Sequence, residues 1–239
     1  MAHRERIVPS ETSPGIVALH LKRYEFARPW CEGADVLDAG CGVGYGAAYL
    51  APHARTVVGL DRAEEAIAVA RSRYTAPNTE YVEGDLLALP FPDAAFDVVC
   101  AFETIEHVDD PAAMVAEAAR VLRTDGRLIA STPHVLRTDH EPANPFHRVE
   151  LAPADFEALL RRSFGTVELY GERRAQTRRH GLLQRLDVLG LRRRVPPLRI
   201  AERVLGTPAM AHLELSDVII DRTLAGASVV VAVCTGPQR

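Results

Sequence analysis

The sequence contains no long apolar run. Nowhere do about 18 consecutive apolar residues occur, which is the length that a helix needs to cross a bilayer. The first nine residues are largely polar and charged, unlike the apolar segment of a secretory leader. The 239 residues are 47% hydrophobic and 25% charged, close to the average of globular proteins. We therefore expect neither a transmembrane segment nor a signal peptide, and a cytoplasmic location.

Cysteine is also scarce. The four cysteines, Cys31, Cys41, Cys100 and Cys234, form no CxxC pair and show no spacing typical of a disulfide framework. This pattern excludes a disulfide-stapled secreted domain and predicts free thiols in a reducing compartment.

Lysine is nearly absent, since Lys22 is the only one among 28 basic residues. We attribute the bias towards arginine to a GC-rich coding sequence, but that bias does not explain clustering. Residues 161–203 hold twelve arginines against four acids, although the whole chain has a formal charge of -4. The cluster fits a solvated face, a site for an anionic acceptor, or a peripheral contact with a membrane surface. Nucleic acid fits poorly, because aromatic residues are not interleaved with the arginines and the rest of the chain is acidic.

Hydrophobic periodicity predicts one α/β domain over residues 1–239, with a core at 34–171. Strands alternate with helices, which indicates a doubly wound, Rossmann-like sheet of seven strands. The expected strands are 35–38, 56–61, 79–83, 96–102, 127–132, 165–171 and a last one within 228–236, and the expected helices are 62–73, 111–122 and 153–162.

Two further segments are expected to be helical. Residues 14–28 have helical periodicity after a capping Ser13, and this N-terminal helix is predicted to be a lid. Its Tyr24 either closes over the active site or packs on the sheet. Residues 172–227 separate the last two strands, and leucines among arginines predict an amphipathic helical insertion there.

The sharpest motif is VLDAGCGVG at residues 36–44, a strand that ends in Asp38 and opens into alternate glycines. Glycines allow a tight turn and a close approach of the backbone to a ligand. Gly42, Gly44 and Ala47 also satisfy a dinucleotide fingerprint, so an NAD-type oxidoreductase is one alternative. Asp38 argues against it, because a carboxylate repels a pyrophosphate but attracts the ammonium and sulfonium of S-adenosylmethionine.

Two more acids follow the next two strands. Asp61 ends the second strand, where a carboxylate can accept both hydrogen bonds of a ribose diol. Asp85 follows the third strand, where it can accept a hydrogen bond from the adenine amine. Because the carboxyl ends of parallel strands bind ligands in such folds, acids at three consecutive strand ends indicate a single site.

These motifs resemble those of the class I S-adenosylmethionine-dependent methyltransferases. The resemblance continues through LPFPD at 89–93, FDVV at 96–99 and ETIEHV at 103–108, and it covers about residues 14–170. It is specific for the cofactor and much less so for the acceptor. It implies that the methionine end is held by Asp38, Gly40, Cys41, Gly42, Gly44 and the backbone of Phe102, the ribose by Asp61, the faces of adenine by Arg62 and Leu86, and its amine by Asp85.

Methyl transfer requires mainly that two reactants are positioned and water is excluded. A hydroxyl acceptor also benefits from a proton acceptor, usually histidine. We expect His147 to act as this base, with His107 as the second candidate, although each could be a structural residue instead. The polar stretch at 132–150 resembles an acceptor-side loop, so we expect O-methylation of a small molecule such as a sugar, glycan or natural product. Nitrogen and carbon acceptors are also compatible with the sequence.

Metal binding and a noncatalytic role must be weighed as well. His134, His140 and His147 are spaced by six and seven residues, which matches no familiar metal template, so we expect no metal. Asp110 before Pro111 is typical of a helix cap rather than of an ion ligand. A module that binds the cofactor for regulation stays open, although the intact motifs argue against it. The sequence does not predict the oligomeric state.

Overall fold

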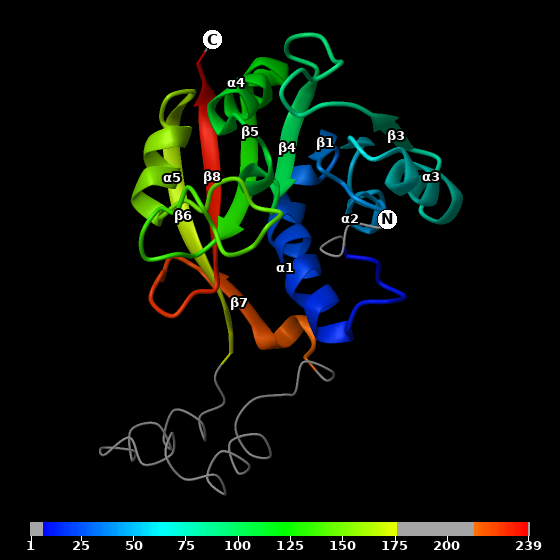
Figure 1. Ribbon diagram of the computed structural model, residues 1–239. Coiled ribbons are helices and arrows are strands. Elements are labelled where there is room, and N and C mark those ends of the chain that lie inside the picture. Colours follow the sequence, from blue (N-terminus) through cyan, green and yellow to red (C-terminus); the bar gives the residue numbers. More distant parts are fainter. Residues whose placement is uncertain (1–6, 176–212, 239) are drawn as a thin grey trace, which may run out of the picture.

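The computed structural model describes residues 7–175 and 213–238, and its centre is a sheet of eight strands (Figure 1). The strands are β1 (Asp35–Ala39), β2 (Thr56–Asp61), β3 (Thr79–Glu83), β4 (Phe96–Phe102), β5 (Leu122–Pro133), β6 (Phe164–Arg174), β7 (Val218–Asp221) and β8 (Val229–Pro237). The helices are α1 (Pro14–Cys31), α2 (Tyr45–Leu50), α3 (Glu64–Arg73), α4 (Pro111–Val121) and α5 (Pro153–Leu160). The fold is the expected Rossmann-like, doubly wound one.

The strand order is β3-β2-β1-β4-β5-β8-β6-β7. β1 to β5 are parallel, and β8 runs antiparallel between β5 and β6. The order reverses between β1 and β4, because the chain first builds outward to β3 and then returns to the other side of β1. Ligands bind at such a switch point in open α/β sheets, outside the carboxyl ends of the strands.

All seven expected strands are present, and the eighth is a difference from the sequence-based prediction. β7 lies inside 172–227, for which the sequence predicts a helical insertion. In the described part of that segment, β6 runs on to Arg174 and pairs antiparallel with β7, from Gly171 opposite Asp221 to Arg174 opposite Val218. The four residues of β7 are too few for alternation to reveal a strand. The helices predicted within 176–212 lie outside the described residues.

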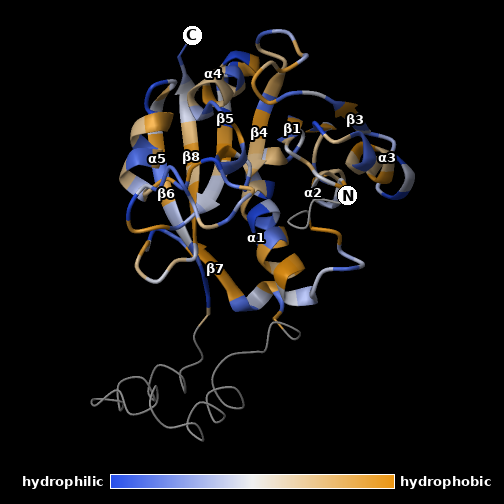
Figure 2. Cartoon of the chain, in the orientation of Figure 1, coloured by the Kyte–Doolittle hydropathy of each residue, from blue (hydrophilic) through white to orange (hydrophobic). Residues whose placement is uncertain are grey.

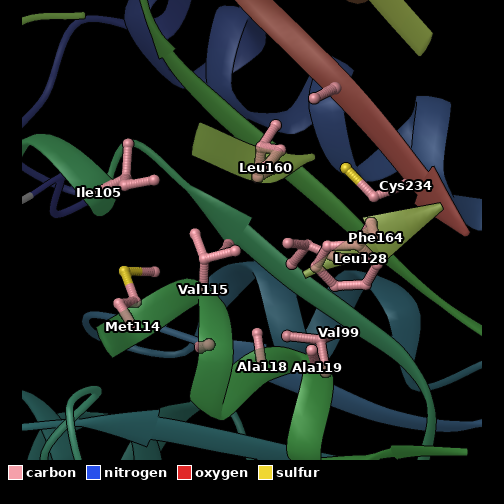
Figure 3. Packing of buried hydrophobic residues seen from close by; sticks show 14 of the residues in the cluster. Val99, Ile105, Met114, Val115, Ala118, Ala119, Leu128, Leu160, Phe164 and Cys234 are labelled. Atoms are coloured by element: carbon pink, nitrogen blue, oxygen red, sulfur yellow. The ribbon is translucent and has the colours of Figure 1, made fainter. Parts of the chain in front are cut away.

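The helices cover the sheet in two layers. Tyr24 of α1 and Leu50 of α2 pack, together with α3, on one face, while α4 and α5 pack on the other. In Figure 3, Val115, Ala118 and Ala119 of α4 lie next to Val99 and Leu128 of the sheet. Apolar residues are concentrated along the central strands (Figure 2). Two apolar cores, one per face, therefore hold the sheet rigid beneath its carboxyl ends.

The sequence predicts helix caps at Asp110 and Ser13, and capping hydrogen bonds from the side chain are present only at Asp110. The Asp110 carboxylate accepts hydrogen bonds from Ala112 N and Ala113 N, each at 3.0 Å, so this residue is confirmed as a cap. Ser13 stands at the start of α1, but its hydroxyl makes no capping hydrogen bond.

All four cysteines are buried, and none of them forms a disulfide. Among the described residues, no helix combines the length and the apolarity that a bilayer span requires.

Candidate active site

A cavity of about 1330 Å³ opens at the carboxyl ends of the parallel strands, around the switch point. Its wall is formed by α1, the turn after β1, the ends of β2 to β4, and the loops at 102–109 and 144–148. Sites for small molecules usually measure roughly 300–1,000 Å³. The cavity is therefore large enough for a cofactor and a second reactant together.

The glycine turn forms one side of this cavity. Gly40 has φ +84°, and a side chain there would place its Cβ 2.2 Å from Thr104 Cγ2, so only glycine fits. Gly40, Cys41 and Gly42 line the cavity as predicted. Gly44 is not among its lining residues, and a Cβ on it would meet Ala70 at 2.7 Å. The absence of a side chain at Gly44 therefore allows the start of α2 to pack closely against α3.

Asp61 stands at the end of β2 and faces the cavity. Its Oδ2 accepts a hydrogen bond from Gly42 N and its Oδ1 accepts one from Ala63 N, both at 2.9 Å. A carboxylate has about four acceptor positions, so the two oxygens can also receive a ribose diol. The same carboxylate thus orients the glycine turn and presents acceptors to a ligand.

The predicted adenine-binding residues lie together farther along the same wall. Arg62, Asp85 and Leu86 all line the cavity. Asp85 Oδ1 accepts a hydrogen bond from Leu87 N at 2.9 Å, which fixes the carboxylate. Leu86 is partly buried against the apolar core and offers a flat base an apolar surface. The residues present therefore fit the nucleoside half of S-adenosylmethionine.

Asp38, which is predicted to hold the methionine end of the cofactor, is not among the residues that line the cavity. Its side chain is buried, with 1% exposure, and it accepts a hydrogen bond from the Tyr24 hydroxyl at 3.1 Å. Burial raises the pKa of Asp38 to about 7, the charge of Asp61 raises it further, and the Tyr24 hydrogen bond opposes both. Tyr24 itself lines the cavity and packs edge-on against Phe102, with ring centroids 4.9 Å apart.

A buried ion pair that the sequence did not reveal anchors α1. Arg23 Nε donates to Glu172 of β6 at 2.8 Å, and Arg23 Nη1 lies 3.8 Å from Glu103. Burial alone would lower the pKa of Arg23, but Glu103 and Glu172 raise it more. Burial, and then the charge of Arg23, lower the pKa of His20 to about 3, so this ring is neutral and accepts from Arg23.

Glu103 is a further cavity residue that the sequence analysis missed. It follows β4 directly and has φ +50°, an uncommon conformation for a residue other than glycine. Ser131 Oγ donates to Glu103 Oε1 at 2.9 Å and holds the side chain in place. The sequence could have revealed Glu103 as a site residue, because it stands at a strand end just as Asp61 and Asp85 do.

Both predicted catalytic histidines line the cavity, and their ring centroids lie 4.9 Å apart. His107 Nδ1 donates to the carbonyl of Phe146 at 3.0 Å, and His147 Nδ1 lies 2.7 Å from Glu150 Oε1. A carbonyl oxygen only accepts, so Nε2 of a neutral His107 carries the lone pair. His147 Nε2 lies 3.0 Å from the amide nitrogen of Asn144, whose oxygen accepts from Phe146 N. This arrangement makes His147 Nε2 an acceptor too.

The other two histidines of the polar stretch are placed elsewhere. His134 Nδ1 donates to Ala227 O at 2.9 Å and so ties β5 to the turn before β8. His140 is exposed, and neither residue lines the cavity.

A cavity at the switch point of a parallel sheet, with a glycine turn and acids at the strand ends, defines a Rossmann-like protein that binds a nucleoside cofactor. Three comparisons with known proteins narrow this class. Residues 37–130 match the methyltransferase domain family.

Two curated mycobacterial proteins extend the match. Over 144 residues the chain is 45% identical to a protein of Mycobacterium tuberculosis named "Probable S-adenosylmethionine-dependent methyltransferase", which covers 59% of this chain and 52% of the relative. It is 32% identical over 202 residues to phthiotriol/phenolphthiotriol dimycocerosates methyltransferase 1 of Mycobacterium ulcerans, covering 82% of this chain and 69% of the relative.

A solved structure shows the same fold. The YcgJ protein of Bacillus subtilis superposes with a TM-score of 0.61 at 20% identity, over 92% of this chain and 99% of that one. The chain belongs to the class I S-adenosylmethionine-dependent methyltransferases, whose cofactor is S-adenosylmethionine. It spans about half the length of the Mycobacterium tuberculosis relative. The comparisons do not favour an NAD-type oxidoreductase.

Proposed function

We propose that this protein transfers a methyl group from S-adenosylmethionine to a hydroxyl oxygen of a small molecule. One observation carries the proposal: the acids that suit the cofactor and two histidines with acceptor Nε2 atoms line the same cavity. The cofactor supplies a methyl group activated by its sulfonium. The protein supplies position, exclusion of water and a destination for the proton.

The cofactor half of the site is proposed to be fixed by backbone and carboxylates. The main chain of Gly40 and Gly42 permits close approach, and Asp61 binds the ribose hydroxyls. Glu103 and the buried Asp38 give the region near the glycine turn a negative potential, which favours the ammonium of the cofactor. Tyr24 and Phe102 add aromatic walls that exclude water.

The acceptor half is proposed to be the histidine pair. Glu150 orients His147 through Nδ1, so Nε2 is the atom that takes the hydroxyl proton. His107 is held by the carbonyl of Phe146 and contacts the His147 ring, so it restricts the position of that ring. Both side chains then act on the acceptor rather than on the cofactor.

A small hydroxylated acceptor is supported by the resemblance of the 132–150 stretch to acceptor loops for sugars and natural products. The Mycobacterium ulcerans relative is also named for triols, which carry hydroxyl groups.

An anionic acceptor is a second proposal, supported by the twelve arginines in 161–203, of which Arg173 already pairs with Asp221. The same charge would allow peripheral membrane contact. The four buried cysteines, none of which forms a disulfide, support a reducing, cytoplasmic site of action.

The test is a transfer assay with isotopically labelled S-adenosylmethionine and small-molecule extracts, followed by mass spectrometry of the labelled product. We expect label in a methyl ether or ester of a small molecule. Label on nitrogen, carbon, protein or nucleic acid would contradict the acceptor assignment. Cofactor that binds and is never consumed would favour the noncatalytic binding module.

A further inference from the structure

Three metal-ligating side chains converge on the acceptor side of the cavity. The donor atoms of Glu106, His107 and His147 all lie within 4.8 Å of one another. Glu106 and His107 belong to a short 3₁₀ turn after β4, whereas His147 comes from the 144–148 loop. The hydrogen bond from Arg148 N to Glu106 O, 2.6 Å long, ties the two segments together. The chain therefore builds this cluster from two separate loops.

Glu106 is the unusual member of the cluster. Its side chain is 1% exposed, and neither carboxylate oxygen has a hydrogen-bond partner within normal limits in the described part of the chain. A buried carboxylate without donors is costly, and a bound cation or proton relieves that cost. The carboxylate thus lacks a partner in a wall that faces a large cavity.

The histidines are arranged as metal ligands usually are. A ligating histidine typically donates its other ring N–H to a carboxylate or a carbonyl, which fixes the ring and the tautomer. His147 has Glu150 in that role, and His107 has the carbonyl of Phe146. In both rings, Nε2 is then the nitrogen that carries the lone pair.

We propose that Glu106, His107 and His147 bind a divalent transition metal ion. Two imidazoles and one carboxylate suit Zn²⁺, Mn²⁺ or Fe²⁺ rather than Mg²⁺ or Ca²⁺, which prefer oxygen ligands. Ligand atoms at about 2.1 Å from one ion lie roughly 3 to 4 Å apart, so the three side chains need to close in only slightly. The amide of Asn144 releases His147 Nε2 in that movement.

The sequence predicted no metal. The histidines weighed there as ligands were His134, His140 and His147, and the first two of these do not line the cavity. Glu106 and His107 are adjacent in sequence and lie about forty residues from His147, a spacing that no short motif describes.

The consequence for catalysis rests on the proposed function. An ion at this cluster lies in the cavity wall near the acceptor, where its charge favours loss of the proton from a bound hydroxyl to water. His147 Nε2 is then a ligand and not the base. Removal of metal with a chelator distinguishes the role of His147 as a base from its role as a metal ligand. A histidine base works without metal, whereas a metal-assisted reaction does not.

Binding is tested first, without cofactor or acceptor. The full chain is stripped with a chelator, dialysed, and titrated with Zn²⁺ and separately with Mn²⁺ by calorimetry. We expect one ion per chain, and at least a tenfold loss of affinity in Glu106→Gln and in His107→Ala. His140→Ala is the matched control, because that histidine is exposed and lies outside the cluster. Circular dichroism of the metal-free variants verifies that they fold.

Each outcome bears on one part of the proposal. Absence of binding by the folded wild type, or equal affinity in wild type and the two cluster variants, would overturn the metal site. Stoichiometric binding that only the cluster variants lose would support it. Methylation that disappears on chelation and returns with Mn²⁺ or Zn²⁺, at unchanged cofactor affinity, supports the catalytic role. Methylation unaffected by chelation refutes that role, and a protein that binds metal but never methylates counts against the proposed function alone.

Discussion

At the scale of single residues, Asp61 combines two tasks in one carboxylate. It accepts from Gly42 N and Ala63 N, and so it shapes the glycine turn, and it is proposed to bind the ribose as well. Asp61→Ala is expected to weaken cofactor binding by about 1.5 to 3 kcal/mol, since hydrogen bonds to a charged group are each worth about that much. Calorimetry with S-adenosylhomocysteine measures the loss. Asp125→Ala, at an exposed position of β5, serves as control, and a loss below about 0.3 kcal/mol would contradict the ribose role.

Asp38 is expected to give the cofactor site a pH dependence. Burial raises its pKa to about 7, so the carboxyl is ionised above that value and protonated below it. Because the ammonium of the cofactor favours the ionised form, affinity is expected to fall up to about tenfold between pH 8 and pH 6. Asp38→Asn should bind weakly and lack this fall, which isolates the contribution of Asp38 from titration of the ligand.

The raised pKa of Asp38 also makes the stability of the fold depend on pH. Stability changes with pH in the opposite direction to cofactor affinity. Between about pH 4 and pH 7 the folded chain keeps a proton on Asp38 that the unfolded chain has released, so this group makes stability decrease as pH rises through that window. Urea denaturation of wild type and Asp38→Asn at pH 5 and pH 7 measures the difference. Parallel pH profiles for the two proteins would show that Asp38 is not the group responsible.

His147 is the residue on which turnover should depend. A positioned proton acceptor increases the rate by a factor of roughly 10² to 10⁴. If His147 is a metal ligand instead, its removal also removes the ion that promotes loss of the proton from the acceptor hydroxyl. His147→Ala is therefore expected to reduce kcat by at least about 10² with unchanged affinity for S-adenosylhomocysteine. His140→Ala should leave both quantities unchanged. A retained kcat within a factor of about three would mean that positioning alone suffices.

The part of the site that the sequence predicted is the part fixed by local geometry. Asp61, Asp85 and the glycine turn follow their own strands, so their place at the sheet edge can be derived from the order of elements. Asp38 was placed correctly along the chain, but its burial under Tyr24 depends on how α1 packs. The isolation of Glu106 likewise depends on the 144–148 loop, which no pattern in the sequence positions.

At the scale of elements, α1 is fixed by the buried pair between Arg23 and Glu172, which are 149 residues apart. Removing one member of a buried pair leaves an uncompensated charge and typically costs about 3 to 5 kcal/mol. Glu172→Leu is therefore expected to lower the free energy of unfolding by up to about 3 kcal/mol, the lower end of that range, because Glu103 still lies 3.8 Å from Arg23. The double variant Arg23→Met with Glu172→Leu should recover a large part of the loss. Additive losses in urea denaturation would contradict the pairing.

Alternation of strands and helices was sufficient to predict seven strands, because the central ones, such as β1, β4 and β8, are buried between two layers and read as apolar runs. It was insufficient for β7, whose four residues pair only with β6 at the sheet edge. The extension of β5 back to Leu122 was also missed, since polar residues such as Asp125 interrupt its apolar pattern.

At the scale of the whole molecule, the cavity joins α1, the strand ends and two loops, so a bound cofactor should stabilise all of them together. Ligand at about 100 times its dissociation constant contributes about 2.7 kcal/mol. For a chain of this size that corresponds to a rise in Tm of about 5 to 10 °C. Thermal unfolding with S-adenosylhomocysteine measures the rise, and NAD⁺ is the control that should produce none. A shift with NAD⁺ alone would contradict the cofactor assignment.

The position of β8 has a consequence for synthesis on the ribosome. β8 is the last strand to be translated, yet it lies between β5 and β6 and pairs with both along most of its length. Until residues 229–237 have left the exit tunnel, the nascent chain exposes two unpaired strand edges, and β6 has no place in the sheet. Unpaired edges of this kind invite association with other chains. Translation must therefore pass β8 before the protein can close its sheet.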